Sequence, residues 1–341
     1  MSTARDVALL LALGSVVACS STTDTTPTAP IELSPNPQTW AITDSSTVLL
    51  PLGAGYQPTR TLRVGSVLRT YYVTPHATQS APLTLVFSES VDGRNFSNTT
   101  LTNLHSTVVP GTVSEPFFDH PDVIRRADGK YLMIYDFVTD PALSPTPRRM
   151  AAFVSADGIT WGDSVMLPET TIDESPGTHK AIQARASMIQ LADGSIRAYY
   201  NTGGASIGSA RSTDGGVTWT EDAGYRLSAD PGITVEDPSA MIDTDGSVLL
   251  YVKYLPSFSC GSGTGKLGGC SSIRMARAAD GLNFTMYAGD VVHPPATVVD
   301  NAIYASPDVF VGIDGTWRMQ FQLFRNSISD NGGMLMAVRQ P

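Results

Sequence analysis

Residues Asp119–Phe137 read DHPDVIRRADGKYLMIYDF: a polar cluster with a proline, an apolar run, an Asp-Gly turn and a strand rich in aromatic residues. This order predicts a β-hairpin, because β-branched and aromatic residues favour strands and Asp-Gly favours the tight turn between them. The same order recurs elsewhere in the chain. Aligned on Pro121, the other copies are Tyr56-Gln57-Pro58, Ala184-Arg185-Ala186, Glu236-Asp237-Pro238 and Ala305-Ser306-Pro307.

The turn of each copy lies at a constant distance from this anchor. It begins seven residues later in all five copies, at Gly65-Ser66, Asp128-Gly129, Asp193-Gly194, Asp245-Gly246 and Asp314-Gly315. A fixed offset that is repeated along the chain indicates a repeat architecture, in which each copy is one structural unit.

A second element recurs between the hairpins. We name its four copies the box turns: Ser90–Phe96, Ser155–Trp161, Ser212–Trp219 and Ala278–Phe284. Ser and Asp side chains accept backbone N–H bonds in tight turns, Gly adopts positive φ, and the aromatic ring anchors the turn in a core. The box turns resemble the Asp-box of sialidases and related β-propellers. We therefore expect their aspartates to be structural and not catalytic.

Together a hairpin, a third strand, a box turn and a fourth strand make the four-stranded blade of a propeller. We predict an all-β, five-bladed β-propeller with blades at about 50–105, 116–168, 181–228, 235–293 and 303–341. The last blade lacks a fourth strand, and a strand from residues 40–50 would complete it and close the ring. The alternative is a six-bladed, sialidase-like propeller.

Composition limits the class of function. Only 16% of the 341 residues are charged, and Gly and Pro are plentiful, which suits strands and turns. The net charge of −10 and the absence of clustered Lys and Arg exclude a nucleic-acid binder, because contacts to phosphates require such clusters.

The N-terminal residues predict export. Arg5 precedes an apolar stretch at 7–17 that is too short to span a bilayer but suits a signal peptide, and Val16–Cys19 resembles a bacterial lipobox. The sequence thus predicts a signal peptide at 1–19 with a lipidated Cys19, a Ser/Thr/Pro tether at 20–37 and one propeller domain at 38–341. The protein would be anchored at the bacterial outer membrane or cell surface, and the alternative is a plain signal peptide cut nearby.

Two further cysteines, Cys260 and Cys270, flank a glycine-rich loop. In an oxidising compartment a disulfide between them is the simplest interpretation. A metal site is the alternative, although two thiols without a His pair are a poor zinc shell. We predict no metal site and no cofactor, with a calcium ion in the central channel as the alternative.

Inner strands of a propeller begin at one face of the channel, so the residues around each anchor should meet in one funnel. These residues are Tyr56, Gln57, Asp119, His120, Gln183, Arg185, Glu236, Asp237, Tyr304 and Ser306. Such a mixture of carboxylates, amides, cations and aromatic groups favours sugar binding. Glycoside hydrolysis needs two carboxyl groups across the scissile bond. We take Asp119, Glu236 and Asp237 as the candidate catalytic residues, and His120 as a ligand for sugar or cation or a structural side chain.

The segments FFDHPDVIRRADGKYLMIYDF and VEDPSAMIDTDGSVLLYV resemble inner-strand motifs of five-bladed glycosidases, notably family 43 and its relatives in families 32 and 68. This resemblance implies a first-blade Asp as base, a D-P-S Asp that tunes the acid, and an E-G-P Glu as acid. Asp237 matches the tuning position. The other two positions, Gln57 and Ala305, carry no carboxylate, so Asp119 and Glu236 would supply the groups from other blades. Asp237 would then raise the pKa of Glu236.

Three functions follow from these patterns. The first is a surface-anchored glycoside hydrolase that acts on a polysaccharide or oligosaccharide, and the second is a non-catalytic glycan-binding or scaffolding lipoprotein. The third is a sialidase, in which Arg185 would bind the substrate carboxylate and Tyr304 or Tyr56 would be the nucleophile. We expect a monomer whose partners are carbohydrate and, through the lipid alone, a membrane.

Overall fold

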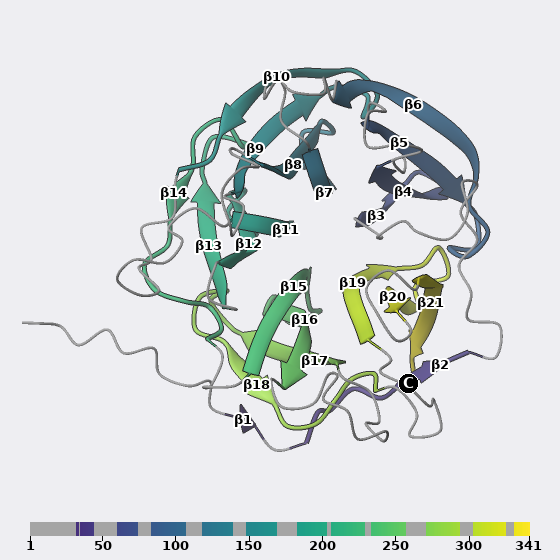
Figure 1. The fold of residues 1–341 in the computed structure, drawn as a ribbon, viewed down its shortest axis with the longest axis vertical. Coiled ribbons are helices and arrows are strands. Elements are labelled where there is room, and N and C mark those ends of the chain that lie inside the picture. Colours follow the sequence, from purple (N-terminus) through teal and green to yellow (C-terminus); the bar gives the residue numbers. More distant parts are fainter. Residues whose placement is uncertain are drawn as a thin grey trace, which may run out of the picture.

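The computed structural model describes residues 32–33, 35–43, 60–73, 83–106, 118–138, 148–168, 183–202, 206–228, 233–256, 271–293, 303–324 and 331–341. All elements in these ranges are strands, and they form five sheets arranged around a centre (Figure 1). The predicted five-bladed β-propeller is confirmed. Strands β3, β7, β11, β15 and β19 are the innermost strands of the five blades.

The blades follow one another along the chain. Blade 1 contains β3 (Arg60–Val64), β4 (Val67–Val73), β5 (Leu83–Ser90) and β6 (Ser97–Ser106). Blade 2 contains β7 (Phe118–Arg125), β8 (Tyr131–Val138), β9 (Arg148–Ser155) and β10 (Trp161–Met166). Blade 3 contains β11 (Gln183–Gln190), β12 (Ile196–Thr202), β13 (Ile207–Ser212) and β14 (Thr220–Glu221). Blade 4 contains β15 (Ile233–Ile242), β16 (Val248–Pro256), β17 (Ser272–Ala278) and β18 (Thr285–Tyr287). Blade 5 contains β19 (Ile303–Val311), β20 (Trp317–Phe324) and β21 (Asn331–Arg339).

The N-terminal strands complete two blades. Strand β2 (Trp40–Ile42) pairs antiparallel with β21 and supplies the fourth strand of blade 5, which confirms the predicted ring closure. Strand β1 (Glu32–Leu33) adds a parallel fifth strand to the edge of blade 4 at β18. In the same region the Tyr251 hydroxyl donates to Oε1 of Gln38 at 2.6 Å.

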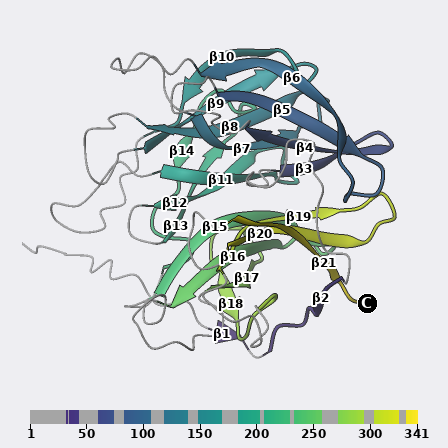
Figure 2. The ribbon, with the colours of Figure 1, turned by 45° about the vertical axis from the view of Figure 1, so that its right-hand side comes forward.

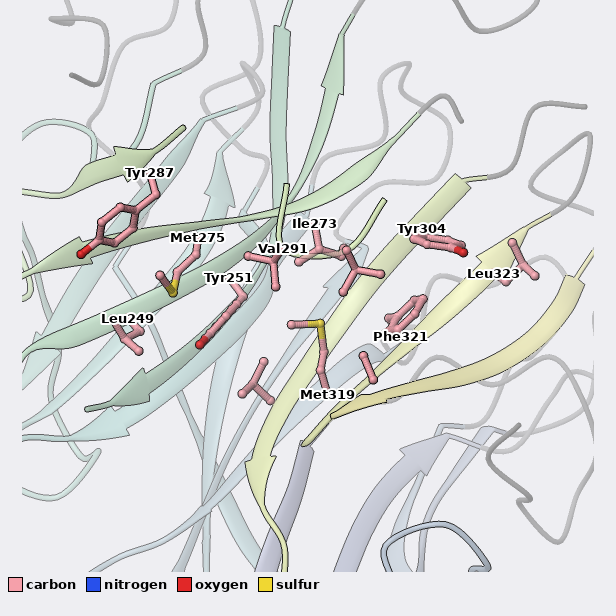
Figure 3. Packing of buried hydrophobic residues seen from close by; sticks show 13 residues of the cluster. Leu249, Tyr251, Ile273, Met275, Tyr287, Val291, Tyr304, Met319, Phe321 and Leu323 are labelled. Carbon is pink, nitrogen blue, oxygen red and sulfur yellow. The ribbon is translucent and has the colours of Figure 1, made fainter. Parts of the chain in front are cut away.

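The hydrophobic core lies between the blades. Separate clusters of buried side chains fill the five interfaces, and each cluster joins residues of two neighbouring blades. Between blades 4 and 5, Tyr251, Met275, Met319 and Phe321 pack together (Figure 3). Because the apolar area is buried between sheets, each blade depends on its two neighbours for stability.

Antiparallel pairing gives the disc two distinct faces. All inner strands begin at one face, which we name the start face, and end at the other, which we name the turn face. The hairpin turns and the box turns lie at the turn face, and Figure 2 shows the β19–β20 hairpin and the blue turns of blade 1 on the same side.

The box turns are held by the bonds that their sequence predicts. In blade 1, Oδ1 of Asp92 accepts the N–H groups of Arg94 and Asn95 at 2.8 Å each, and Oγ of Ser90 accepts the N–H of Gly93 at 2.9 Å. The corresponding Asp157, Asp214 and Asp280 accept the equivalent bonds. These aspartates serve the turns, far from the start face.

Each box turn also accepts a hydrogen bond from the preceding blade. The Tyr71 hydroxyl donates to the carbonyl of Gly158 at 3.1 Å, and the Tyr199 hydroxyl donates to that of Gly281 at 2.8 Å. Guanidinium groups do the same elsewhere: Arg126 donates to Gly215 and Arg318 to Asp92. The turns therefore join successive blades as well as successive strands.

Cys19, Cys260 and Cys270 lie outside the described residues, so their predicted lipidation and disulfide stay predictions. In the described part of the chain, no helix is long and apolar enough to cross a membrane.

Candidate functional site

Four inner strands carry the same backbone irregularity near the start face. Their register shifts between Asp119 and Asp122 and at the equivalent points of β11, β15 and β19. Within each shift one residue has positive φ: His120 (46°), Arg185 (54°), Asp237 (54°) and Ser306 (50°). A left-handed residue other than glycine costs about 1–2 kcal/mol. Four such bulges at equivalent positions mark the start face as the candidate functional site.

Polar groups from neighbouring strands hold these bulged residues in place. Oδ1 of Asp136, on β8, accepts the backbone N–H of Arg185 at 3.1 Å. Oδ1 of Asn201, at the matching place on β12, accepts that of Asp237 at 2.9 Å. Asp237 itself accepts the N–H of Ser306 at 3.0 Å through Oδ2. Blades 2, 3 and 4 thus each fix the bulge of the next blade.

The bulged side chains join into one chain of contacts across four blades. Nδ1 of His120 lies 3.0 Å from Oδ1 of Asp136, which also holds Arg185. Nη1 of Arg185 pairs with Oδ1 of Asp237, whose other oxygen faces Ser306. The predicted residues His120, Arg185 and Asp237 are therefore brought together, with Arg185 at the centre of the series.

The charges of Asp237 and Arg185 keep both side chains ionised. Burial alone would raise the pKa of Asp237, but the positive charges of Arg185 and Lys253 and the bonds from Arg185 and Ser306 outweigh it and hold the pKa well below its usual range. Burial would lower the pKa of Arg185, yet Asp237, Glu236 and Asp136 together raise it. Asp237 is thus a permanent negative charge and no proton donor.

Glu236 faces a different partner. Its Oε2 accepts a hydrogen bond from Nζ of Lys253 at 2.8 Å, directly across the β15–β16 pair. The Glu236 side chain keeps 32% of its surface exposed, whereas that of Asp237 keeps 2%. Glu236 is therefore the carboxylate of this group that a ligand can reach, and Lys253 is its cationic partner.

The remaining predicted site residues do not all lie at the start face. Tyr304 was expected to line the funnel, and the structure corrects this: its side chain is 3% exposed and its ring lies 4.8 Å from that of Phe321, in the core between blades 4 and 5. This happens because alternate residues of an inner strand face opposite sides of the blade. Asp119 is the second residue of β7, and Gln183 is the first residue of β11. Tyr56 and Gln57 lie outside the described residues.

Three contributors were missed from the sequence. Asp136, Lys253 and Arg60 do not belong to the anchor pairs. A signal for the first two existed: the second strand of each of blades 2 to 5 carries one polar residue opposite the start of the inner strand, namely Asp136, Asn201, Lys253 and Gln322. Arg60 was missed because it lies two residues after Pro58, whereas the equivalent residues of the other blades lie one residue after their anchors.

Arg60 belongs to a ring of polar residues one step deeper in the channel. Asp122, Ser187 and Ser239 each accept a backbone N–H of the next blade, and Asp308 does so from Thr61. Asp122 and Asp308 are therefore contacts between blades. Arg60 occupies the fifth position and donates to Oγ of Ser187 and to the carbonyl of Ala240.

The two buried carboxyls of this ring are hard to ionise. Burial raises the pKa of Asp122 to about 7, against the opposing effects of Arg60 and the Met188 N–H, and Asp308 adds to the rise. Burial also raises the pKa of Asp308. Among the described residues, no three His, Cys, Asp or Glu side chains gather as a metal site.

Comparison with known proteins places the fold. Neither a protein-family model nor a curated protein matches the sequence. Among solved structures, a xylan β-1,4-xylosidase from Bacillus halodurans C-125 aligns with a TM-score of 0.60 and 14% identity over 85% of this chain, which spans about half (54%) of the xylosidase chain.

Two shorter structures align over nearly their whole length. A thermostable family-43 glycoside hydrolase gives a TM-score of 0.57 and 17% identity, covering 86% of this chain and 92% of its own. An endo-arabinase from Bacteroides thetaiotaomicron gives 0.55 and 13%, covering 87% of this chain and 97% of its own. The chain therefore has the five-bladed propeller fold of family 43 glycosidases.

Proposed function

We propose that this protein is a glycoside hydrolase that binds a polysaccharide or oligosaccharide at the start face and cleaves a glycosidic bond there. The observation that carries the proposal is the series of four bulges, which turns His120, Arg185, Asp237 and Ser306 into one bonded group at the channel. The solved structures with the same fold include a xylosidase and an arabinase, which supports a sugar as the ligand.

The chemistry divides between Glu236 and its neighbours. Glu236 keeps 32% of its side chain exposed, so it is the carboxyl that we assign to exchange a proton with a glycosidic oxygen or a water. Asp237 remains charged and holds the Arg185 guanidinium, which orients polar sugar groups. Asp119, the second residue of β7, lies opposite Asp136 in the strand pair and is the proposed second carboxyl.

A substrate screen tests the proposal. The wild type, Glu236→Gln and the exposed, outer-strand control Asp163→Asn would be assayed on aryl arabinosides, xylosides and galactosides and on plant polysaccharides. We expect hydrolysis of at least one substrate, about 10²–10⁴-fold slower in Glu236→Gln and unchanged in Asp163→Asn. Equal rates in the wild type and Glu236→Gln would contradict the assigned role of Glu236.

A second candidate, a non-catalytic glycan-binding protein, is favoured by one observation. Asp136, Asp237 and Glu236 each have a cationic or histidine partner, so these described start-face carboxylates are held by other protein groups. Hydrolysis by no variant, together with saturable glycan binding that Arg185→Ala abolishes, would establish this candidate. A panel with neither hydrolysis nor binding would exclude both.

The position of the protein in the cell is proposed from the sequence alone. Lipidation of Cys19 and the tether at 20–37 would hold the propeller at a membrane surface, where extracellular glycans are accessible.

A further inference from the structure

The channel opens at the turn face into a cavity of about 500 Å³, at the end opposite to the candidate glycan site. Its walls are successive rings of inner-strand residues. The ring at the mouth contains Arg63, Arg125, Gln190, Ile242 and Val311. The next ring, one residue deeper in the channel, contains Leu62, Ile124, Ile189, Met241 and Phe310. The volume is that of a site for a small organic ligand.

The mouth carries positive charge that no described residue neutralises through an ion pair. Among the ion pairs of the described residues, none involves Arg63 or Arg125, which donate only to the carbonyls of Gly65 and Gly129 in their own turns. Four other arginines on this face are paired with turn aspartates: Arg126 with Asp128, Arg211 with Asp193, Arg277 with Asp245 and Arg318 with Asp314. In a protein of net charge −10, two unpaired guanidinium groups at one opening are an anion-attracting feature.

The rest of the opening is apolar. Across the mouth from the arginines, Ile242 is 37% and Val311 is 36% exposed, both unusually high for large apolar side chains of inner strands. At the floor, Arg60 lies 4.0 Å from Asp122, and Asp308 also acts on it, so the floor holds a cation with carboxyl partners. The two channel arginines that have no carboxyl partner among the described residues thus lie at the mouth.

We propose that this cavity binds an amphiphilic organic carboxylate, with its carboxylate on Arg63 and Arg125 and its apolar body against Leu62, Ile124 and Met241. Guanidinium groups bind carboxylates through paired, charge-assisted hydrogen bonds. Three residues of strand separate the floor from the mouth, a depth of about 10 Å, which suits a medium-length alkyl chain. This site is independent of the glycan site, because the two lie at opposite ends of the channel.

Calorimetric titration with octanoate tests the proposal on the full chain. We expect saturable binding at one site in the wild type, weakened about tenfold or more in the double variant R63Q/R125Q. The matched control R211Q removes a paired arginine of the same face and leaves the affinity unchanged. Acetate, which lacks the apolar body, and octanol, which lacks the charge, bind much more weakly than octanoate.

Any of three results would overturn the proposal: no saturable binding of octanoate, equal affinity for octanol, or equal affinity in R63Q/R125Q and the wild type. Both substituted arginines are exposed, so the double variant should keep its fold, and its thermal unfolding would be measured beside that of R211Q. Glu236→Gln retains octanoate binding, which separates this site from the proposed hydrolase.

Discussion

Single residues at the start face are in conformations that work against folding. His120, Arg185, Asp237 and Ser306 have positive φ inside strands, where glycine would fit with less strain. The bonds from Asp136 and Asn201 offset part of this cost. Keeping larger side chains at such positions is expected where the side chains themselves are needed, as in a binding site.

Ser306 allows this strain to be measured. Substitution by Gly and by Ala removes the same hydroxyl, whose contact with Oδ2 of Asp237 is long at 3.4 Å, but only Gly relieves the left-handed backbone. We expect Ser306→Gly to be more stable than Ser306→Ala by about 1 kcal/mol in chemical denaturation. An alanine variant as stable as the glycine variant would show that no strain is stored there.

Asp122 predicts a dependence of stability on pH. Its pKa rises from 3.8 to about 7 on folding, so the native state binds the proton more tightly than the unfolded state between these values. The free energy of unfolding should therefore fall as pH rises through this window. Asp308, whose pKa is also raised, acts in the same direction.

Urea denaturation at pH 5 and pH 8 tests this assignment. Asp122→Asn can still accept the Met188 N–H but cannot ionise, so its loss of stability between the two pH values should be smaller than that of the wild type. The exposed control Asp163→Asn should behave like the wild type. A variant with an undiminished loss would place the titrating group elsewhere.

At the scale of elements, the box turn is the joint between blades. Its glycine needs positive φ and also lies against the preceding blade: a Cβ at Gly158 (φ +74°) would collide with the hydroxyl of Tyr71. The turn therefore couples a local backbone requirement to packing between sheets, which explains why the Gly recurs in each box turn.

A pair of glycine substitutions separates the two requirements. Gly194, in the β11–β12 hairpin, has φ +83°, but a Cβ added there would meet nothing within 4 Å, so Gly194→Ala introduces backbone strain alone. Gly158→Ala also disturbs the buried hydrogen bond from the Tyr71 hydroxyl. It should therefore lower the free energy of unfolding by about 2 kcal/mol more than Gly194→Ala does. Equal melting temperatures for the two variants would argue against a joint between the blades.

The sequence predicted elements better than it predicted the site. The hairpins, the box turns and the closing strand followed from the repeat, because turn chemistry and periodicity are local. Arg60 was missed because the other residues of the polar ring lie one residue after their anchors. Counting one residue from Pro58 gives Thr59 and not Arg60. The hairpin of blade 1 closes over two residues between Val64 and Val67, while that of blade 2 closes over five between Arg125 and Tyr131.

The site also depended on contacts that no local pattern contains. Lys253 reaches Glu236 across a strand pair, and Asp136 binds the backbone of the next blade. Tyr304 looked like a funnel residue, yet its strand directs it into the core between blades. Which side of a blade a residue faces is set by strand register, which the bulges shift.

At the scale of the whole molecule, β2 closes the ring. Trp40 packs against Tyr251 with ring centroids 5.8 Å apart, and the N–H of Gln340 donates to the carbonyl of Thr39 at 2.8 Å. A chain that begins at residue 44 should lose about 3 kcal/mol of stability relative to one that begins at residue 31. It should also self-associate, because the edge of β21 is uncovered.

Thermal unfolding and light scattering of the two chains test this role. The longer chain keeps β1 and β2 and is the control. Equal stability and equal monodispersity would mean that the closing strand contributes nothing.

The proposed anchor belongs to the same scale. Cys19→Ser should move the protein from the membrane fraction to the soluble exported fraction, because a lipid can no longer be attached. Fractionation and metabolic labelling with a fatty acid would measure this. Retention of the variant in the membrane fraction would contradict anchoring through Cys19.

The pairing of β2 with β21 also has a consequence for the order in which the chain folds. Trp40 pairs with Arg339, so ring closure joins two strands that lie very far apart in the sequence, and it cannot form until β21 has been synthesised. A chain interrupted before β21 therefore leaves β2 without its partner strand. Only a chain that extends through β21 can pair these two strand edges with each other.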